Sequence, residues 1–89
     1  MTSTFTLGQT LITPQARDTL HPEDILGAIG RHASGDWGDV CDEDRQENEY
    51  SLSQYLRLFS VYHDRNGTKF WIITEAVRSA TTVLLPEDY

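Results

Sequence analysis

The chain has 89 residues, of which 38% are hydrophobic, and a formal net charge of −7. This length and composition predict a single folded domain, residues 1–89, and exclude a disordered acidic tail. The negative charge argues against direct binding to nucleic acid or to an anionic membrane, because each phosphate contact would oppose the field of the protein itself.

The first predicted elements are a short strand or extended arm and a short helix. Phe5 and Leu7 alternate with polar residues within 4–13, which is the period of a strand. Thr13 and Pro14 then mark a helix start, since the threonine hydroxyl can accept from a free amide of the first turn and proline needs no partner there. We expect this helix to span about residues 14–20.

A second predicted helix follows and ends at about residue 33. Pro22 repeats the start signal, and Glu23 and Asp24 lie in the first turn, where the helix dipole favours acidic residues. The apolar residues of this stretch recur at helical spacing, and Gly35 follows as a stop signal.

Residues 36–49 hold seven of the fourteen acidic residues and only one arginine, so the acidity of the chain is one local patch. We expect a short helix over residues 39–48. Only Trp37, Val40 and Cys41 can form its apolar face, and Cys41 is therefore expected in the core. Such a helix would dock by its N-terminal end and leave its remainder in water.

Three strands are predicted in the C-terminal half, at 55–62, 69–74 and 81–85. Asn66 and Gly67 supply the positive φ angles that a tight hairpin requires between the first two. Trp71 lies in a run that is apolar on both faces, so this strand is expected to be central. Pro86 ends the third strand. Together the pattern predicts an α+β domain, a three-stranded antiparallel β-meander with two or three short helices from the N-terminal half packed on one face.

The sequence shows no pattern of catalytic or metal-binding residues, and we expect neither an enzyme nor a cofactor. Zinc ligands pair at about two to four residues, whereas His32, Cys41 and His63 lie far apart. Neither histidine forms a triad with Ser34 or Ser60 by sequence position. Cys41 has acidic neighbours, which disfavour a reactive thiolate. A single cysteine excludes an internal disulfide and, without a secretory leader pattern, predicts a cytoplasmic protein.

The acidic patch has two interpretations: a solvated surface that keeps a small protein soluble, or a mimic of nucleic-acid phosphates. On a helix, carboxylates three or four residues apart lie about 5–6 Å apart and can follow a phosphate backbone. One such row would hold Asp36, Asp39, Glu43 and Glu47. The concentration of charge favours mimicry, because solubility alone does not require it. The candidate partner-binding residues are Asp36, Asp39, Asp42, Glu43, Asp44, Glu47 and Glu49.

Three segments carry a family resemblance. They read Arg-His-Ala-Ser-Gly-Asp-Trp-Gly (31–38), Gly-Thr-Lys-Phe-Trp-Ile-Ile-Thr-Glu-Ala (67–76) and Arg-Ser-Ala-Thr-Thr-Val-Leu-Leu-Pro-Glu-Asp-Tyr (78–89). The sequence in these segments resembles a family of small bacterial proteins described as plasmid-related. The resemblance implies a home on plasmids, prophages and other mobile elements. Small acidic proteins of such elements often include inhibitors of host defence, anti-CRISPR proteins among them, and several of these look like DNA mimics.

We therefore expect a small, non-enzymatic protein that inhibits a nucleic-acid-binding host defence complex, as an anti-CRISPR protein of the DNA-mimic type. Its partner would be the basic surface of a nucleic-acid-binding protein or of a CRISPR effector complex, with no direct contact to nucleic acid or membrane. A monomer is expected rather than a dimer. The alternative is a regulatory or ligand-binding module with a pocket around His32, Asp36, Trp37 and Arg78, where the glycines beside Trp37 would let the backbone approach closely.

Overall fold

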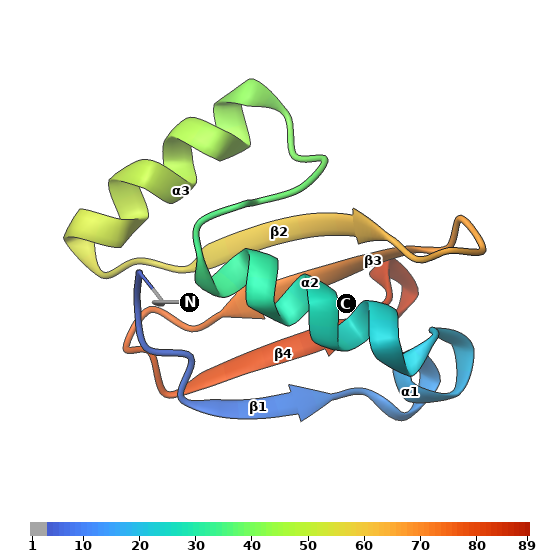
Figure 1. Cartoon of the computed structure of the whole chain (residues 1–89). Helices are drawn as coiled ribbons and strands as arrows, with labels where there is room; N and C mark the ends of the chain where they lie inside the picture. Colours follow the sequence, from blue (N-terminus) through green and yellow to red (C-terminus); the bar gives the residue numbers. More distant parts are fainter. Residues whose placement is uncertain (1–3) are drawn as a thin grey trace.

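The computed structural model describes residues 4–89, which form a mixed sheet of four strands with helices around it (Figure 1). The strands are β1 (Gln9–Ile12), β2 (Leu58–His63), β3 (Lys69–Thr74) and β4 (Ala80–Leu84). Their spatial order is β1-β4-β3-β2. β2, β3 and β4 form the predicted antiparallel meander, and the α+β class is confirmed. The sheet has a fourth strand that the three-stranded prediction lacked.

That fourth strand, β1, comes from the N-terminal segment and runs parallel to β4. Phe5 and Leu7, which the sequence placed on the strand, precede it. Gly8 leads into β1 with a φ of +67°, and a Cβ there would lie 2.4 Å from the Ser79 backbone, so only glycine fits. A parallel pair needs a long crossover connection, and here most of the chain lies between the two strands. Local sequence patterns therefore could not show this pairing.

The described residues also include three α-helices and a C-terminal 3₁₀ turn: α1 (Pro14–Thr19), α2 (Pro22–Ala33), α3 (Asp42–Gln54) and η1 (Pro86–Asp88). α1 and α2 start where the sequence predicts. Thr13 Oγ1 accepts from the Ala16 amide at 3.2 Å, and His21 Nδ1 accepts from the Glu23 amide at 3.2 Å. Each side chain thereby satisfies one free amide of a first helical turn.

α3 starts later and ends later than the predicted helix over 39–48. Its buried positions are Asn48 and Ser51, polar residues that hydrophobic periodicity does not detect. Trp37 and Val40 are buried, but they lie in the connection before the helix. Cys41 is the N-cap residue and is exposed, so the prediction of a core cysteine is wrong. Because α3 extends to Gln54, β2 begins three residues later than predicted.

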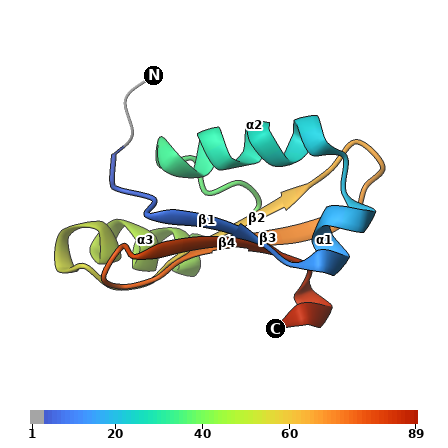
Figure 2. The same ribbon diagram turned by 90° about the horizontal axis from the view of Figure 1, so that it is seen from below.

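The layers of the molecule are visible in the two ribbon views. α2 lies across one face of the sheet, while α3 lies beside β2, at the edge opposite β1 (Figures 1 and 2). The prediction that the helices share one face therefore holds for α2 but not for α3. The main core lies between the sheet and the first two helices and consists of Ala16, Leu20, Ile25, Ala28, Tyr62, Phe70, Ile72, Val83 and Leu85.

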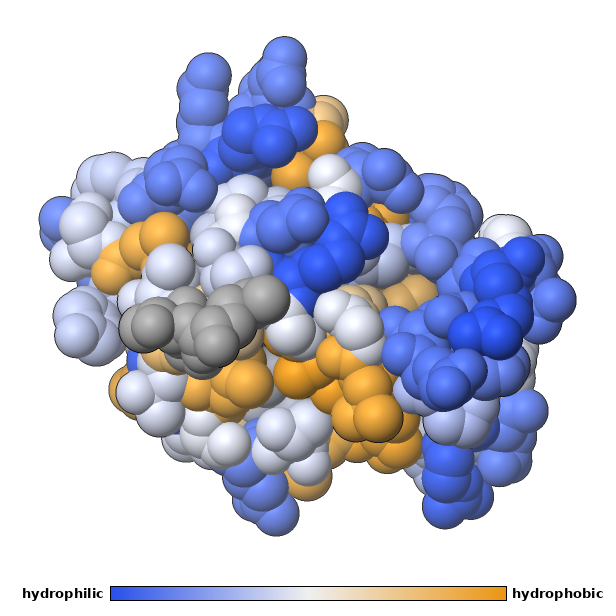
Figure 3. Space-filling model, in the orientation of Figure 1, coloured by the Kyte–Doolittle hydropathy of each residue, from blue (hydrophilic) through white to orange (hydrophobic). Residues whose placement is uncertain are grey.

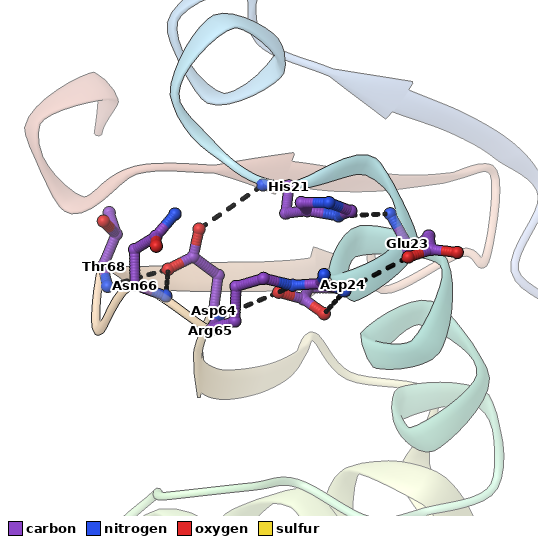
Figure 4. Close-up of polar contacts among 7 residues, drawn as sticks. All are labelled: His21, Glu23, Asp24, Asp64, Arg65, Asn66 and Thr68. Atoms are coloured by element: carbon purple, nitrogen blue, oxygen red, sulfur yellow. Dashed lines mark hydrogen bonds and ion pairs between the residues drawn. The ribbon is translucent and has the colours of Figure 1, made fainter.

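The β2–β3 hairpin ends in a turn that is tied to the start of α2 (Figure 4). The predicted hairpin is confirmed, but of the Asn-Gly pair only Gly67 has positive φ, at +82°. Buried Asp64 accepts from the backbone amides of Asn66 and Thr68 at 2.9 and 3.0 Å. Arg65 forms a two-pronged ion pair with Asp24 of α2, at 3.0 and 3.1 Å. These bonds shape the turn from within and anchor it to the helix.

The outer edge of β2 is closed by two neighbouring segments. The Asn48 side chain donates to the Phe59 carbonyl at 2.6 Å and accepts from the Phe59 amide at 3.0 Å. Two residues further along, the Val61 amide donates to the Trp37 carbonyl, and the Asp39 amide donates to the Val61 carbonyl. α3 and residues 37–39 thus replace a further strand, which protects this edge from pairing with other chains.

Replacing Asn48 by alanine tests this closure. We expect Asn48→Ala to lower the free energy of unfolding by about 2–3 kcal/mol, because two backbone groups of Phe59 lose their partner. Alanine favours helix formation, so a loss of stability in this variant cannot come from its helix propensity. The control is Gln46→Ala on the exposed side of α3, expected within about 0.5 kcal/mol of the wild type. Urea unfolding of both variants measures the difference, and equal effects would contradict the closing role of Asn48.

Candidate functional site

The seven predicted partner-binding acids fall into two groups, and the first group is bound within the protein. Asp36 forms two hydrogen bonds with Arg31, at 2.8 and 3.2 Å, and these hold the pKa of the Asp36 carboxyl below its usual range. Asp39 Oδ2 lies 2.8 Å from Nδ1 of His63. Glu49 accepts from the Trp37 indole N–H at 2.9 Å. These three carboxylates hold the connection before α3 in place.

The second group is Asp42, Glu43, Asp44 and Glu47, in the first two turns of α3. Among the described residues, its one basic contact joins Arg45 Nε to Asp42 Oδ1 at 3.9 Å, and the Asp42 side chain is 94% exposed. Hydrophilic side chains project from this part of the surface (Figure 3). The predicted helical row shortens to Glu43 and Glu47, because Asp36 and Asp39 precede the helix.

Groups of opposite charge lie at the two ends of α3: its own acidic residues at the start, and Arg78 from another segment beside the end. Three acidic side chains lie in the first turn, where the helix dipole stabilises them. At the other end, the buried Arg78 guanidinium donates to the carbonyls of Ser51 and Leu56, at 2.9 and 2.6 Å. Burial lowers the pKa of Arg78. Arg78 therefore satisfies the last turn of α3 and fixes the helix that presents the acidic group.

A buried chain of polar side chains lies under α2. His32 is fully buried, with Nδ1 2.5 Å from Ser60 Oγ and Nε2 2.9 Å from Thr74 Oγ1. Thr74 Oγ1 lies 2.7 Å from Thr81 Oγ1, which bonds to the Leu7 carbonyl at 2.7 Å. A carbonyl only accepts, so Thr81 donates to Leu7, Thr74 donates to Thr81, and His32 Nε2–H donates to Thr74. Nδ1 is then the acceptor for the Ser60 hydroxyl.

This direction of donors makes His32 a neutral imidazole with a defined tautomer. Burial, and secondarily the charge of Arg78, lower the pKa of His32 to about 4. The sequence did not predict the pairing of His32 with Ser60, which resembles a nucleophile and its base. Both side chains are 0% exposed, and Ser60 donates its proton within a fully satisfied chain. We therefore assign the pair a structural role.

The two tryptophans lie in different environments. Trp37 was expected on the apolar face of the predicted helix or, in the alternative, in a pocket; it is 1% exposed and packs against His32 and Phe5. Residues 37–39 pair with the β2 edge, which places Trp37 in the interior. Trp71 lies on β3, which is an inner strand as predicted, but its side chain is only partly buried and packs against Phe59 and Tyr89.

A pocket with a volume of about 940 Å³ lies beside Arg78. Its lining residues are Thr4, Phe5, Thr6, Leu7, Gly8, Leu52, Tyr55, Val77 and Arg78. Of the predicted pocket set, only Arg78 belongs to it. His32 and Trp37 lie behind Phe5, and Asp36 is ion-paired with Arg31.

Several residues that shape these sites were missing from the sequence-based prediction. Asn48 and Tyr55 hold α3, the latter as a C-cap residue with a φ of +55°. A buried asparagine inside an acidic helix gives no hydrophobic signal. Within residues 4–89 there is no group of three or more potential metal ligands, and no helix long and apolar enough to cross a membrane.

Comparisons with protein-family models, with curated proteins and with solved structures found no match to the chain.

The buried histidine predicts a specific dependence of stability on pH. The unfolded chain binds a proton at His32 near pH 6.5, whereas the folded protein does so only near pH 4. The stabilisation is therefore complete above about pH 6.5 and is lost as the pH falls towards 4, at a total of about 3 kcal/mol. His32→Gln should remove this part of the pH dependence, whereas His63→Gln, at an exposed position, should retain it.

Urea unfolding at several pH values measures both variants, and NMR titration of the wild-type imidazole measures the pKa directly. A pKa of His32 near 6.5 would contradict the buried neutral state.

Proposed function

We propose that the protein is a non-catalytic binding protein that docks through the first two turns of α3 onto the basic surface of a nucleic-acid-binding protein. The observation that carries this proposal is the second acidic group, Asp42, Glu43, Asp44 and Glu47. These carboxylates have almost no basic contact within the described residues, whereas Asp36, Asp39 and Glu49 are engaged internally.

The arrangement of α3 supports docking in preference to a merely solubilising role. The helix is held by a buried asparagine amide and by Arg78, so its outward carboxylates are presented on a rigid support. Glu43 and Glu47 are one turn apart, about 5–6 Å, on the exposed side. Rigid charges lose little conformational entropy on binding, which favours a specific electrostatic contact.

The specific form of the proposal is inhibition of a host defence complex, as an anti-CRISPR protein that mimics DNA. Its support is the resemblance of residues 31–38, 67–76 and 78–89 to plasmid-related proteins, together with the local acidity. Several residues of those segments serve the fold, including His32, Trp37, Thr74 and Arg78. The acidic group on α3 lies outside the three segments. A surface that recognises one particular partner need not belong to the segments that carry the resemblance.

Removing charge from α3 tests the proposal. We expect Glu43→Gln/Glu47→Gln to weaken partner binding about tenfold, because two carboxylates no longer face the basic surface. Asp18→Asn/Glu87→Gln is the matched control, since it removes the same charge from exposed positions outside α3. The partner is first captured with tagged protein from host lysate at low salt, and affinities are then measured as salt is raised.

The affinity of the wild type for the partner should fall steeply as the salt concentration rises, and the affinity of the α3 variant should fall less steeply. Nucleic acid should compete for the captured partner. Equal affinities of the two double variants, or binding that salt does not change, would overturn the proposal.

A second candidate function is binding of a small anionic ligand in the pocket beside Arg78. The observation that favours it is a buried guanidinium whose bonds to described residues all go to carbonyls and none to a carboxylate. Aromatic rings of Phe5 and Tyr55 lie beside the guanidinium, at 5.8 and 5.3 Å from its carbon.

Ligand-detected NMR with small carboxylates tests this second candidate. Binding should be lost in Val77→Trp, which fills the mouth of the pocket from an exposed position. Binding that survives this substitution would place the ligand elsewhere.

A further inference from the structure

Within residues 4–89, backbone groups on the outer edge of β1 have no hydrogen-bond partner. The Gln9 amide donates to the Ser79 carbonyl, just before β4, and the Thr13 amide donates to the Val83 carbonyl of β4, at 3.0 Å each, so odd-numbered residues of this segment face inward. The N–H and C=O of a strand residue in a parallel pair point to the same side, and the groups of Thr10 and Ile12 therefore face outward. No described residue bonds to them. This edge contrasts with β2, whose outer groups are closed by α3 and residues 37–39.

The surface around this edge suits self-association. No charged residue occurs from Thr4 to Ala16, although the chain carries a net charge of −7. Leu11 is 42% exposed on β1, and Leu26 is 71% exposed on α2. Figure 3 shows apolar surface beside α2 on the side of β1. An uncharged edge in an acidic protein can meet its own copy without the repulsion that other surfaces would produce.

We propose that two copies of the chain pair antiparallel through β1, with a two-fold axis at Leu11. Thr10 of one copy then lies opposite Ile12 of the other, and each such pair exchanges two hydrogen bonds. A register centred on Ile12 would place Thr10 opposite Pro14, which lacks an amide hydrogen. A register centred on Thr10 would place Ile12 opposite Gly8, which precedes β1 and has a φ of +67° instead of an extended backbone. The two Leu11 side chains meet at the axis as a non-hydrogen-bonded pair, where side chains are closest.

The dimer is also favourable electrostatically. The two four-stranded sheets become one sheet of eight strands, ordered β2-β3-β4-β1 and then the reverse. α3 lies beside β2, so the two acidic helices occupy the far ends of the assembly. This inference departs from the monomer expected from the sequence. It does not depend on the proposed function, because α3 stays free in either state.

Sedimentation equilibrium between about 1 µM and about 1 mM tests the dimer, since a small interface implies modest affinity. We expect the mass to rise from 10.1 kDa towards twice that value. Leu11→Lys should weaken association about 100-fold or more, because two positive charges meet at the axis. Tyr50→Lys is the matched control, an exposed apolar residue on α3 at the opposite edge, and should dimerise like the wild type.

Disulfide trapping in a Cys41→Ser background tests the register. Leu11→Cys places two thiols on a non-hydrogen-bonded pair, with Cα atoms about 4.5 Å apart, within reach of a disulfide. Thr10→Cys places them on diagonal positions, about 8 Å apart and too distant. Rapid dimer formation by the first variant only is expected. A wild type that stays monomeric, or equal trapping of both variants, would overturn the proposal.

Discussion

The hydrogen-bond chain through His32 is the interaction on which the rest of the structure depends. It begins at Ser60 on β2, passes through His32 on α2 to Thr74 on β3 and Thr81 on β4, and ends at the Leu7 carbonyl. Five segments of the protein meet at these hydrogen bonds. Each member has its partner, so the desolvation of the polar groups is compensated, and one arrangement of donors satisfies them all. A polar chain of this kind defines the position of α2 over the sheet more narrowly than apolar contacts do.

Further contacts connect this buried hydrogen-bond chain to the acidic surface. Trp37 packs on His32 and donates to Glu49, while the backbone around Trp37 closes the β2 edge. Asn48 continues that closure, and Arg78 satisfies the far end of α3. The helix has little apolar face, and hydrogen bonds to backbone groups, together with the bond between Trp37 and Glu49, hold it in place. Its outward side is therefore free of packing constraints and available for carboxylates that contact a partner.

The two edges of the sheet differ in a way that gives them separate roles. The β2 edge is covered and acidic, and the β1 edge is open and uncharged. Charge repels further copies from the first edge, whereas nothing in the described residues opposes association at the second. The β2 edge is thus suited to the basic surface of another protein, and the β1 edge to a second copy of the chain.

The sequence by itself determined the α+β class, the starts of α1 and α2, the β2–β3 hairpin and the concentration of charge in 36–49, because caps, Gly67 and alternation act over a few residues. Only the tertiary structure decided the parallel β1–β4 pair, the polar interior around His32 and the division of the acids into bound and outward groups. These features join residues up to 74 positions apart. A carboxylate at Asp39 and one at Glu43 look alike in sequence, and the difference arises from His63, which only folding brings alongside Asp39.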